Sequence, residues 1–390
     1  MKICIISLDF KPHRSSGLSY YAEDLVRGLQ EVGHSITVIA SQRPGLEVHH
    51  WFDNIEIYRV PSGPLDWISF GWNAAGMLRQ INARSRFQVV HFVDVHFAYA
   101  YKEHFLASIW QSFRQRLTAQ NGWPYHTGFV DMVRRELYYR FARRWMERPS
   151  VERAARLISG CRSTQMEFIQ YYKASPERVD LAFQGIDTDF FCPVPCEDLQ
   201  RQLGLAGRRV IFFMGFITPR KGLEYLAKAL HLLPDDTVLL IAGKWAPHVR
   251  ERFYRALGSG KNRVLELGYI PDEERPRYYS LADVYVSPSI LEGFGITPIE
   301  AMACGTPAVV TSASSGPEEV GDAGRVVPPC NEELLASALF ELLDNEALRE
   351  NLGRIGRQRV LDYFSYRSMT ESTILSYERF LSQSQGGVNG

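Results

Sequence analysis

The chain has 390 residues, of which 45% are hydrophobic and 12% aromatic. This composition excludes an intrinsically disordered chain, and the length predicts two domains. Lysine plus arginine and aspartate plus glutamate both number 44, so the net charge of zero does not point to any class of partner.

The cysteines and the apolar runs bear on the compartment. The six cysteines form no C-x2-C pair and no histidine cluster accompanies them, so a zinc site is not expected. Scattered cysteines fit a reducing cytoplasm. No run approaches the roughly 18 apolar residues of a membrane span, and the apolar start from Lys2 to Leu8 is too short for a signal-peptide core. We therefore expect a protein that is soluble or peripheral to a membrane.

The first elements predict a βαβ unit. Ile3 to Leu8 is a continuous apolar run, as in a buried parallel strand. A polar loop then leads to Gly17, a helix is predicted over 19–32, and a second strand over 35–40. Only Gly17 is present in the loop, so the G-x-G-x-x-G fingerprint is absent and NAD is not indicated. The alternative to a ligand-binding loop is a plain strand-to-helix turn.

Further strands of the first half are predicted over 55–60, 89–96, 106–110 and 155–159, the last of them ending the first sheet. His91 lies inside a strand and is expected to be buried and hydrogen-bonded. Asp94 and His96 lie at the end of that strand, where ligands bind in open α/β sheets, and they are candidate acceptor residues. A purely structural role for His96 is the alternative.

The two halves of the chain differ in charge. Residues 1–185 carry 23 basic and 17 acidic side chains, whereas residues 186–390 carry 21 and 27. The predicted helix over 133–156 interleaves eight arginines with aromatic residues. This pattern is typical of a membrane-surface element or of a site for an anionic lipid-linked acceptor. The alternative is a solvated helix whose aromatic residues face the core. Nucleic acid is not expected, because no recognised binding fold accompanies the arginines.

The second half repeats the alternation of strands and helices after a proline-containing hinge near Pro193. Strands are predicted over 210–214, 238–242, 264–267, 283–287 and 308–311. Helices are predicted over 223–233, 276–282, 334–343, 347–364 and 366–381, and the polar tail 382–390 is expected to be disordered. Two such series joined by a hinge predict two doubly wound α/β domains.

The segment SPSILEGFGITPIEAMACGTP, residues 287–307, carries the strongest motif. Glu292 and Glu300 stand eight positions apart around a glycine loop. Thr297 is predicted to be the N-cap of a short helix, with Glu300 as its capping-box acid. The loop and the helix start suit a phosphate, and the carboxylates suit the hydroxyls of a ribose and a sugar. The alternative is that Glu300 only caps the helix and Glu292 is a loop charge.

A second loop, from Gly215 to Gly222, follows the strand 210–214. Lys221 lies at a predicted helix start, where it can neutralise a diphosphate, and Arg220 can add charge beside it. The alternative is a solvent-exposed Arg-Lys pair.

The pattern E-GFGITPI-E resembles the E-x7-E donor site of the retaining glycosyltransferases of family GT4, and the resemblance is strongest over 205–330. It implies the GT-B fold, in which two Rossmann-like domains face each other across a cleft. The acceptor-binding domain would be 1–185 and the donor-binding domain 186–365, with the helix 366–381 packing back onto the first domain.

The resemblance also implies roles for individual residues. The catalytic residues would be Lys221, Arg220, Glu292 and His96. The donor-binding residues would be Ser16, Gly17, Gly215, Tyr269, Ile270, Phe294, Gly295, Ile296, Thr297 and Glu300. The acceptor residues would be Asp94, His96 and Gln111. No metal and no cofactor are implied.

Three positions depart from the family pattern. Ser16 replaces one of two glycines, Gln111 stands where many members have a histidine, and Phe216 stands where an arginine is usual. Lys221 is therefore the only cation that matches the motif.

The function implied is retaining, metal-independent transfer of a sugar from a nucleotide sugar to a glycan, lipid-linked or small-molecule acceptor. The protein would work in the cytoplasm or at the inner face of a membrane. A sugar phosphorylase, a nucleotide-sugar epimerase and a non-catalytic binding protein on the same scaffold are the alternatives.

Overall fold

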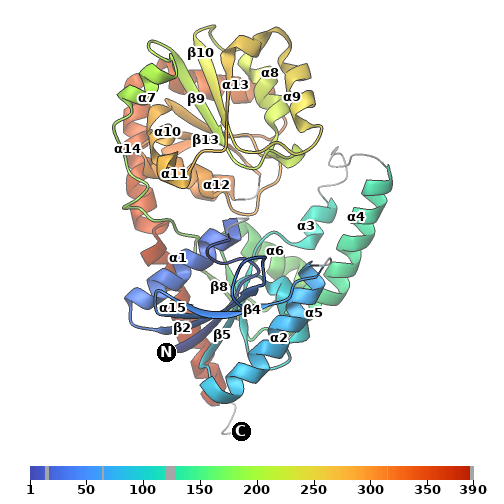
Figure 1. The fold of residues 1–390 in the computed structure, drawn as a ribbon. Coiled ribbons are helices and arrows are strands. Elements are labelled where there is room, and N and C mark those ends of the chain that lie inside the picture. The colour runs from blue at the N-terminus through green and yellow to red at the C-terminus, as the bar shows by residue number, and fades with distance from the viewer. Residues whose placement is uncertain (14–16, 64–65, 119–128, 314, 387–390) are drawn as a thin grey trace. The chain divides into compact units, whose positions relative to one another are not determined.

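The computed structural model of the protein describes residues 1–13, 17–63, 66–118, 129–313 and 315–386. The chain divides into two compact units, each built around one sheet (Figure 1). Of the described residues, those within 1–118, 133–185 and 366–386 form the first unit, and those within 129–132 and 186–365 form the second.

The sheet of the first unit has eight strands in the order β3-β4-β2-β1-β5-β6-β7-β8. All neighbouring strands are parallel except the edge strand β3, which runs antiparallel to β4. The strands are β1 (Lys2–Ile6), β2 (Ser35–Ser41), β3 (His49–Phe52), β4 (Ile55–Val60), β5 (Val89–Phe92), β6 (Leu106–Ile109), β7 (Arg156–Ser159) and β8 (Val179–Leu181). Because β2 and β5 flank β1 on opposite sides, the strand order reverses at β1, which is where doubly wound sheets bind ligands.

The helices of the first unit cover both faces of this sheet. They are α1 (Gly17–Glu31), α2 (Asp66–Ser85), α3 (Phe113–Thr118), α4 (Phe129–Ala142, of which 133–142 belong to this unit), α5 (Arg148–Arg153), α6 (Arg162–Tyr172) and α15 (Tyr366–Gly386). On β1, Ile3 and Ile5 pack in one cluster with α1 and α15, whereas Cys4 and Ile6 pack in another with α2. This alternation is the two-residue period of a strand buried on both faces.

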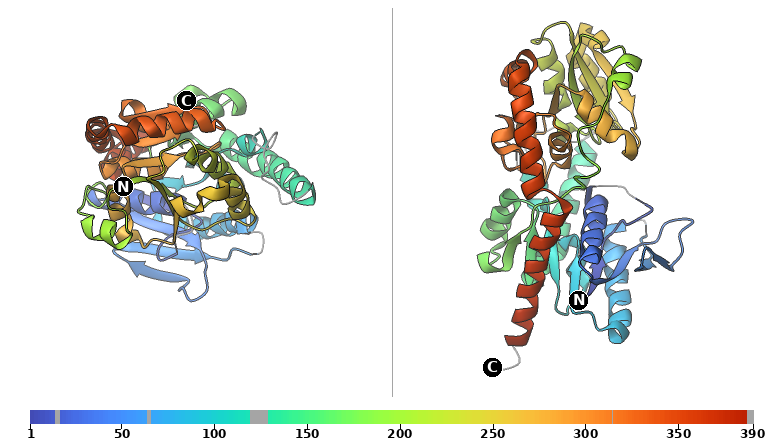
Figure 2. Two further views of the ribbon diagram at one scale, coloured as in Figure 1. Left: turned by 90° about the horizontal axis from the view of Figure 1, so that it is seen from above. Right: turned by 90° about the vertical axis from the view of Figure 1, so that its left-hand side faces the viewer.

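The C-terminal helix α15 belongs to the first unit and lies beside α1 (Figure 2). Gly28 of α1 allows the close approach, because a Cβ atom there would overlap the side chain of Thr370. Tyr377 of α15 reaches the sheet, where its hydroxyl lies 2.8 Å from Nδ1 of the buried His91. Nε2 of His91 lies 2.8 Å from the Ser108 hydroxyl, so the predicted buried, hydrogen-bonded state of His91 is confirmed.

The sheet of the second unit has six parallel strands in the order β11-β10-β9-β12-β13-β14. The strands are β9 (Arg209–Met214), β10 (Thr237–Ala242), β11 (Val264–Gly268), β12 (Val284–Ser287), β13 (Ala308–Thr311) and β14 (Gly324–Val327). The helices are α7 (Glu197–Gln202), α8 (Leu223–Leu230), α9 (Val249–Leu257), α10 (Arg275–Leu281), α11 (Ile296–Ala303), α12 (Gly316–Val320), α13 (Glu332–Asp344) and α14 (Glu346–Tyr363). The strand order reverses at β9, so the loops after β9 and β12 flank the switch point.

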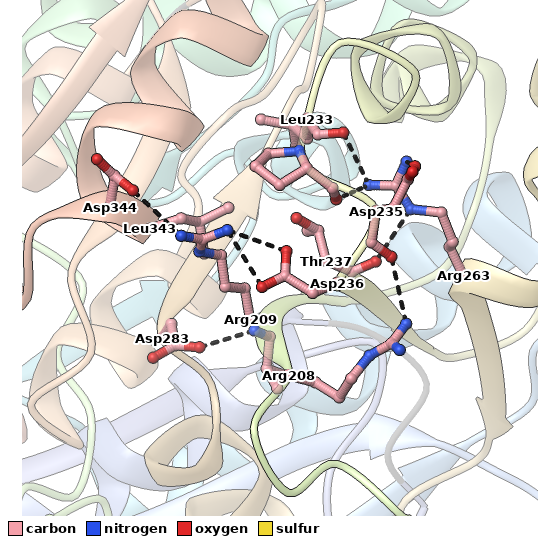
Figure 3. Close-up of polar contacts among 12 residues, drawn as sticks. Arg208, Arg209, Leu233, Asp235, Asp236, Thr237, Arg263, Asp283, Leu343 and Asp344 are labelled. Carbon is pink, nitrogen blue, oxygen red and sulfur yellow. Dashed lines mark hydrogen bonds and ion pairs between the residues drawn. The ribbon is translucent and has the colours of Figure 1, made fainter.

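A network of arginines and aspartates lies at the amino ends of these strands (Figure 3). Arg209, the first residue of β9, contacts Asp236 at 3.0 Å and Asp344 at 3.1 Å. Asp283, just before β12, accepts the N–H of Val210 at 2.7 Å. Ligands bind at the opposite, carboxyl ends of parallel strands, so we read this network as structural.

Several predicted elements differ from the observed ones. The strand predicted over 89–96 ends at Phe92, because Asp94 then caps a 3₁₀ helix, Val95–Ala100, by accepting the N–H of His96. Arg156 does not continue the helix before it but starts β7, where it pairs with Asp180. The strand after it, β8, rather than β7, ends the first sheet.

The predicted disordered tail is partly wrong as well, because 382–386 belong to α15, and 387–390 lie outside the described residues. The sequence did not predict the strands β3, β8 and β14 or the helices α2, α3, α6, α7, α9 and α12.

Candidate functional site

Two loops meet at the carboxyl ends of β9 and β12 in the second unit. The loop after β9 brings Arg220 and Lys221, and the loop after β12 brings Glu292. Arg220 Nη1 lies 2.7 Å from Oε1 of Glu292, and Lys221 Nζ forms an ion pair with Oε2 of the same carboxylate. Two cations and one anion are thus held together, which leaves one formal positive charge.

The backbone explains why these loops meet. Ile290 donates its N–H to the carbonyl of Arg220 at 2.8 Å. Gly222 has a φ of +67°, and a Cβ there would overlap the carbonyl of Pro288. A residue with a side chain would therefore push the two loops apart, which makes the glycine a requirement of the cluster.

The site is largely closed to solvent, which strengthens its electrostatics. The exposed fractions of the side chains are 12% for Lys221, 13% for Glu292 and 26% for Arg220. Burial alone would raise the pKa of Glu292, but the charges of Arg220 and Lys221 outweigh it and lower that pKa to about 2. Burial lowers the pKa of Lys221 below its ordinary value, although Glu292 acts in the opposite direction.

A second buried carboxylate, Glu319 of α12, lies close to this cluster and had not been predicted. It accepts the N–H of Gly295 at 2.5 Å and the hydroxyl of Ser315 at 2.6 Å. Burial, with a contribution from Glu292, raises the pKa of Glu319 to about 7. The N–H that precedes α11, which was predicted to face a phosphate, is therefore paired with a carboxylate in the protein alone.

The predicted start of the helix after Glu292 was wrong. Gly295 is the N-cap of α11, and Thr297 lies inside its first turn. Glu300 does not reach back to cap the helix, because Tyr279 donates its hydroxyl to the Glu300 carboxylate at 2.5 Å and Arg275 pairs with both carboxylate oxygens. Glu300 is only 2% exposed, so its carboxylate is a buried, fixed group.

The remaining predicted donor residues lie at several places in the second unit. Gly215, at the end of β9, has a φ of +149°, and Phe216 after it is 56% exposed. Tyr269 and Ile270 follow β11, and the first is 80% exposed whereas the second is buried. Phe294 lies 6.1 Å from the ring of Phe364. Ile296 starts α11.

The other predicted residues belong to the first unit. Ser16 lies outside the described residues, and Gly17 starts α1. His96 is 2% exposed and lies between two carboxylates, with Nδ1 2.6 Å from Asp94 and Nε2 2.8 Å from Glu147. Burial opposes a charge on His96, but the two carboxylates outweigh it and raise the pKa of the imidazole to about 9. A histidine that is protonated at neutral pH cannot accept a proton, which speaks against His96 as a catalytic base.

The carboxylates around His96 belong to a buried network that the sequence did not reveal. Glu147, in a π-helical turn over 143–147, also accepts the N–H of Phe113 at 3.0 Å and the hydroxyl of Tyr172. The adjoining Ser112 donates to Glu167 at 2.6 Å, and burial raises the pKa of Glu167 to about 7. Gln111, the predicted acceptor residue, is half-buried beside this network.

The arginine-rich segment has both packed and exposed apolar side chains. Ala142 and Met146 pack with Phe113, and Tyr138 and Tyr139 pack partly against them. Other apolar side chains of the same segment are exposed: Leu137 by 62%, Phe141 by 47% and Trp145 by 60%. Arg134, Arg140, Arg143, Arg144 and Arg148 are exposed as well.

The described residues include neither a metal-binding cluster nor a membrane-spanning helix. Within that part of the chain, no group of three or more His, Cys, Asp or Glu side chains is arranged to hold a metal ion. Likewise, none of the described helices is both long and apolar enough to cross a bilayer.

Comparison with known families identifies the chain. The family model described as "Glycosyltransferase Family 4" matches residues 15–190, and the one described as "Glycosyl transferases group 1" matches residues 197–359. The chain belongs to glycosyltransferase family 4. The two matches meet near the hinge: the first covers β2 to β8 of the first sheet, and the second covers the whole second sheet.

Curated relatives of this family member are moderately similar in sequence. O-antigen chain mannosyltransferase B of Escherichia coli is 29% identical over 246 residues, which is 60% of this chain and 64% of that protein. D-inositol 3-phosphate glycosyltransferase of Mycobacteroides abscessus is 32% identical, over 60% of this chain and 54% of that protein. An uncharacterized glycosyltransferase of Methanocaldococcus jannaschii is 26% identical, over 97% of this chain and 98% of that protein. The chain thus spans less than two thirds of the first two relatives.

Solved structures resemble the whole chain. Sucrose-phosphate synthase from Thermosynechococcus elongatus has a TM-score of 0.80 at 22% identity, covering 98% of this chain and 99% of that one. HepE from Anabaena, in complex with UDP-glucose, has a TM-score of 0.73 at 17% identity, covering 98% and 100%. These likenesses establish the GT-B fold.

The pKa of His96 gives a test by stability. A histidine whose pKa is about 9 when folded and 6.5 otherwise stabilises the fold fully below pH 6.5, and this contribution is lost as the pH rises toward 9. We expect the unfolding free energy of the wild type to fall by on the order of 3 kcal/mol over that range. Chemical denaturation at a series of pH values should show this fall, and His96→Gln should lack it.

The matched control for this measurement is His231→Gln, which replaces an exposed histidine of the second unit. It should keep the wild-type dependence on pH. A His96→Gln protein with the same fall in stability as the wild type would show that His96 is not held as an imidazolium.

Proposed function

We propose that the protein is a retaining glycosyltransferase that moves a sugar from a nucleotide-sugar donor to a glycan, lipid-linked or small-molecule acceptor. The observation that carries this proposal is the cluster of Arg220, Lys221 and Glu292 at the switch point of the second sheet. A member of glycosyltransferase family 4 that holds two cations at this point is equipped to bind a diphosphate.

The chemistry breaks the bond between the anomeric carbon of the donor sugar and the oxygen of the diphosphate. Negative charge then develops on the leaving group, and preorganised cations and N–H groups stabilise it. Arg220 and Lys221 would supply the cations, and the N–H groups at the start of α11 would supply fixed dipoles. Single groups of this kind are worth about 3–4 kcal/mol in other enzymes.

The route of the acceptor proton follows from the carboxylates present. Glu292 is already paired with two cations, and Glu300 with Arg275 and Tyr279. Neither is placed as the free acid and nucleophile pair of a glycosidase. The departing diphosphate oxygen would itself take the proton of the acceptor hydroxyl on the same face of the sugar, so the configuration is retained. The proposed step uses no metal, because Arg220 and Lys221 supply positive charge beside the leaving group.

The choice of donor follows from the names of relatives. HepE was crystallised with UDP-glucose, and the Escherichia coli relative is named a mannosyltransferase. A nucleoside diphosphate hexose is therefore the class of donor proposed here. A sugar phosphorylase, the second candidate, would need inorganic phosphate at the same cations and no nucleotide.

The acceptor side belongs to the first unit and includes a membrane contact. Leu137, Phe141 and Trp145 are exposed beside arginines on one continuous helical segment. Exposed apolar side chains next to cations match the boundary between head groups and acyl chains of an anionic bilayer. We therefore place the reaction in the cytoplasm at the inner face of a membrane, where a lipid-linked acceptor would be presented.

Replacing the two cations tests the transfer step. We expect Lys221→Ala to abolish detectable transfer, because the usual arginine is Phe216 here and a phenyl ring cannot balance charge. Arg220→Ala should lower kcat/KM at least tenfold, which is about 1.4 kcal/mol of transition-state stabilisation. Steady-state kinetics with a nucleotide-sugar donor, alongside circular dichroism for folding, measures both.

Lys228→Ala is the matched control, because Lys228 is a lysine of α8 that pairs with Glu332 at 3.1 Å and is 46% exposed. It should leave the kinetics unchanged. Normal activity in a folded Lys221→Ala protein would refute the mechanism, whereas normal activity in Arg220→Ala would refute only the contribution of Arg220.

Flotation with vesicles tests the membrane contact. The wild type should float with vesicles that contain phosphatidylserine and not with pure phosphatidylcholine, and 0.5 M salt should release it, because screening weakens attraction between exposed charges. Replacing Arg140, Arg143 and Arg144 by glutamine should reduce the recovery severalfold.

The control replaces three exposed arginines of the second unit, Arg201, Arg255 and Arg354, by glutamine, which changes the net charge equally. That protein should float as the wild type does. Equal recovery on neutral and anionic vesicles would contradict the membrane contact.

A further inference from the structure

Glu300, one of the two carboxylates predicted to bind hydroxyls of a ribose and a sugar, is held by two side chains of α10. Arg275 is the first residue of that helix and Tyr279 lies one turn later, and both are buried. One nitrogen of Arg275, Nη2, pairs with Oε1 and Oε2 of Glu300. The Tyr279 hydroxyl donates to Oε2 at 2.5 Å. The whole arrangement lies within the second unit.

The donors are distributed unequally over the two carboxylate oxygens. Oε2 accepts two hydrogen bonds, one from Arg275 and one from Tyr279, whereas Oε1 accepts one. A carboxylate offers about four acceptor positions, so the contacts made by the described residues leave one position, on Oε1. A single hydroxyl group is the donor that this remaining position fits.

The charges of the pair are also balanced. A buried carboxylate is costly unless a cation and hydrogen-bond donors accompany it. Although burial opposes the charge on Arg275, Glu300 raises the pKa of that guanidinium above its ordinary value, so the arginine stays charged. The ring of Phe191, whose centroid lies 5.2 Å from the guanidinium carbon, helps to fix the arginine in place.

We propose that Arg275 and Tyr279 are positioning residues for the donor: they hold Glu300 so that its Oε1 accepts one ribose hydroxyl of the nucleotide. This inference rests on the proposed function. It predicts that Arg275 and Tyr279, which touch no substrate, set the affinity for the ribose. A donor without ribose hydroxyls would lose this affinity.

The competing explanation is that Arg275 and Glu300 form a structural ion pair only. Breaking such a buried pair destabilises a protein whether or not a ligand binds, so loss of stability does not separate the two explanations. The dependence of binding on the ribose hydroxyls does separate them, because a structural pair would leave that dependence unchanged.

The experiment measures the dissociation constants of a nucleoside diphosphate and its 2′,3′-dideoxy counterpart by calorimetry. The pair is taken from the uridine, guanosine or adenosine series, according to which diphosphate binds the wild type. We expect the wild type to bind the dideoxy compound at least tenfold more weakly. Arg275→Met and Tyr279→Phe should shrink this ratio to threefold or less, by weakening the binding of the ribose compound alone.

Arg263→Met is the matched control. Arg263 is another largely buried arginine of the second unit, but it donates to the carbonyls of Leu233, Pro234 and Thr237 near the amino end of the sheet (Figure 3). It should keep the wild-type ratio. Tyr279→Phe removes a single hydroxyl, so it keeps the test available if Arg275→Met does not fold.

Two results would overturn the inference. One is a wild-type ratio near one, and the other is a wild-type ratio in both folded variants. If no diphosphate binds the wild type at all, the proposed function fails and the inference fails with it. If a diphosphate binds with a ratio that the variants do not change, only the inference fails.

Discussion

The ion cluster of Glu292 with Arg220 and Lys221 is the interaction on which the account of this protein depends. It ties the loop after β9 to the loop after β12, and it requires Gly222, whose backbone passes against the carbonyl of Pro288. In the protein alone the two cations are neutralised in part by one carboxylate. Under the proposed function, a diphosphate would compete with that carboxylate for the cations, because it carries more negative charge. Under the proposed function, the cluster therefore both joins the two loops and supplies two cations for the diphosphate of the donor.

The amino ends and the carboxyl ends of the strands in the second sheet, which we call its amino edge and its carboxyl edge, carry different kinds of polar network. At the amino edge, Arg209 and its aspartates are partly exposed, and such pairs contribute little to stability. At the carboxyl edge, Glu292, Glu300 and Glu319 are all nearly buried. Burying a carboxylate costs free energy unless the carboxylate is paired. Here the partners are cations, a tyrosine hydroxyl, a serine hydroxyl and a backbone N–H. The three buried carboxylates thus lie at the carboxyl ends of the strands, where doubly wound sheets bind their ligands.

Much of the fold could be predicted from the sequence, because continuous apolar runs such as Ile3–Leu8 mark buried parallel strands. The contact between Lys221 and Glu292 could have been predicted, because both residues follow strands whose carboxyl ends lie together. The contact between Arg275 and Glu300 could not have been predicted, because Arg275 lies 25 positions before Glu300 and no local pattern links the two residues. The capping prediction for Thr297 failed for the same reason: the spacing to Glu300 matches a capping box, but a distant arginine and tyrosine take the carboxylate. The sequence did not predict the contact of Glu147 with His96, because the π-helical turn that holds Glu147 has no sequence signature.

The most direct test of the central claim is the unfolding of the wild type in the presence of UDP, GDP, ADP or inorganic phosphate. If the cluster is a diphosphate site of a nucleotide-sugar enzyme, one nucleoside diphosphate at 100 times its dissociation constant should add about 2.7 kcal/mol of stability. Inorganic phosphate at the same concentration should add much less. Equal stabilisation by phosphate and by all three nucleotides, or none by any of them, would contradict the account.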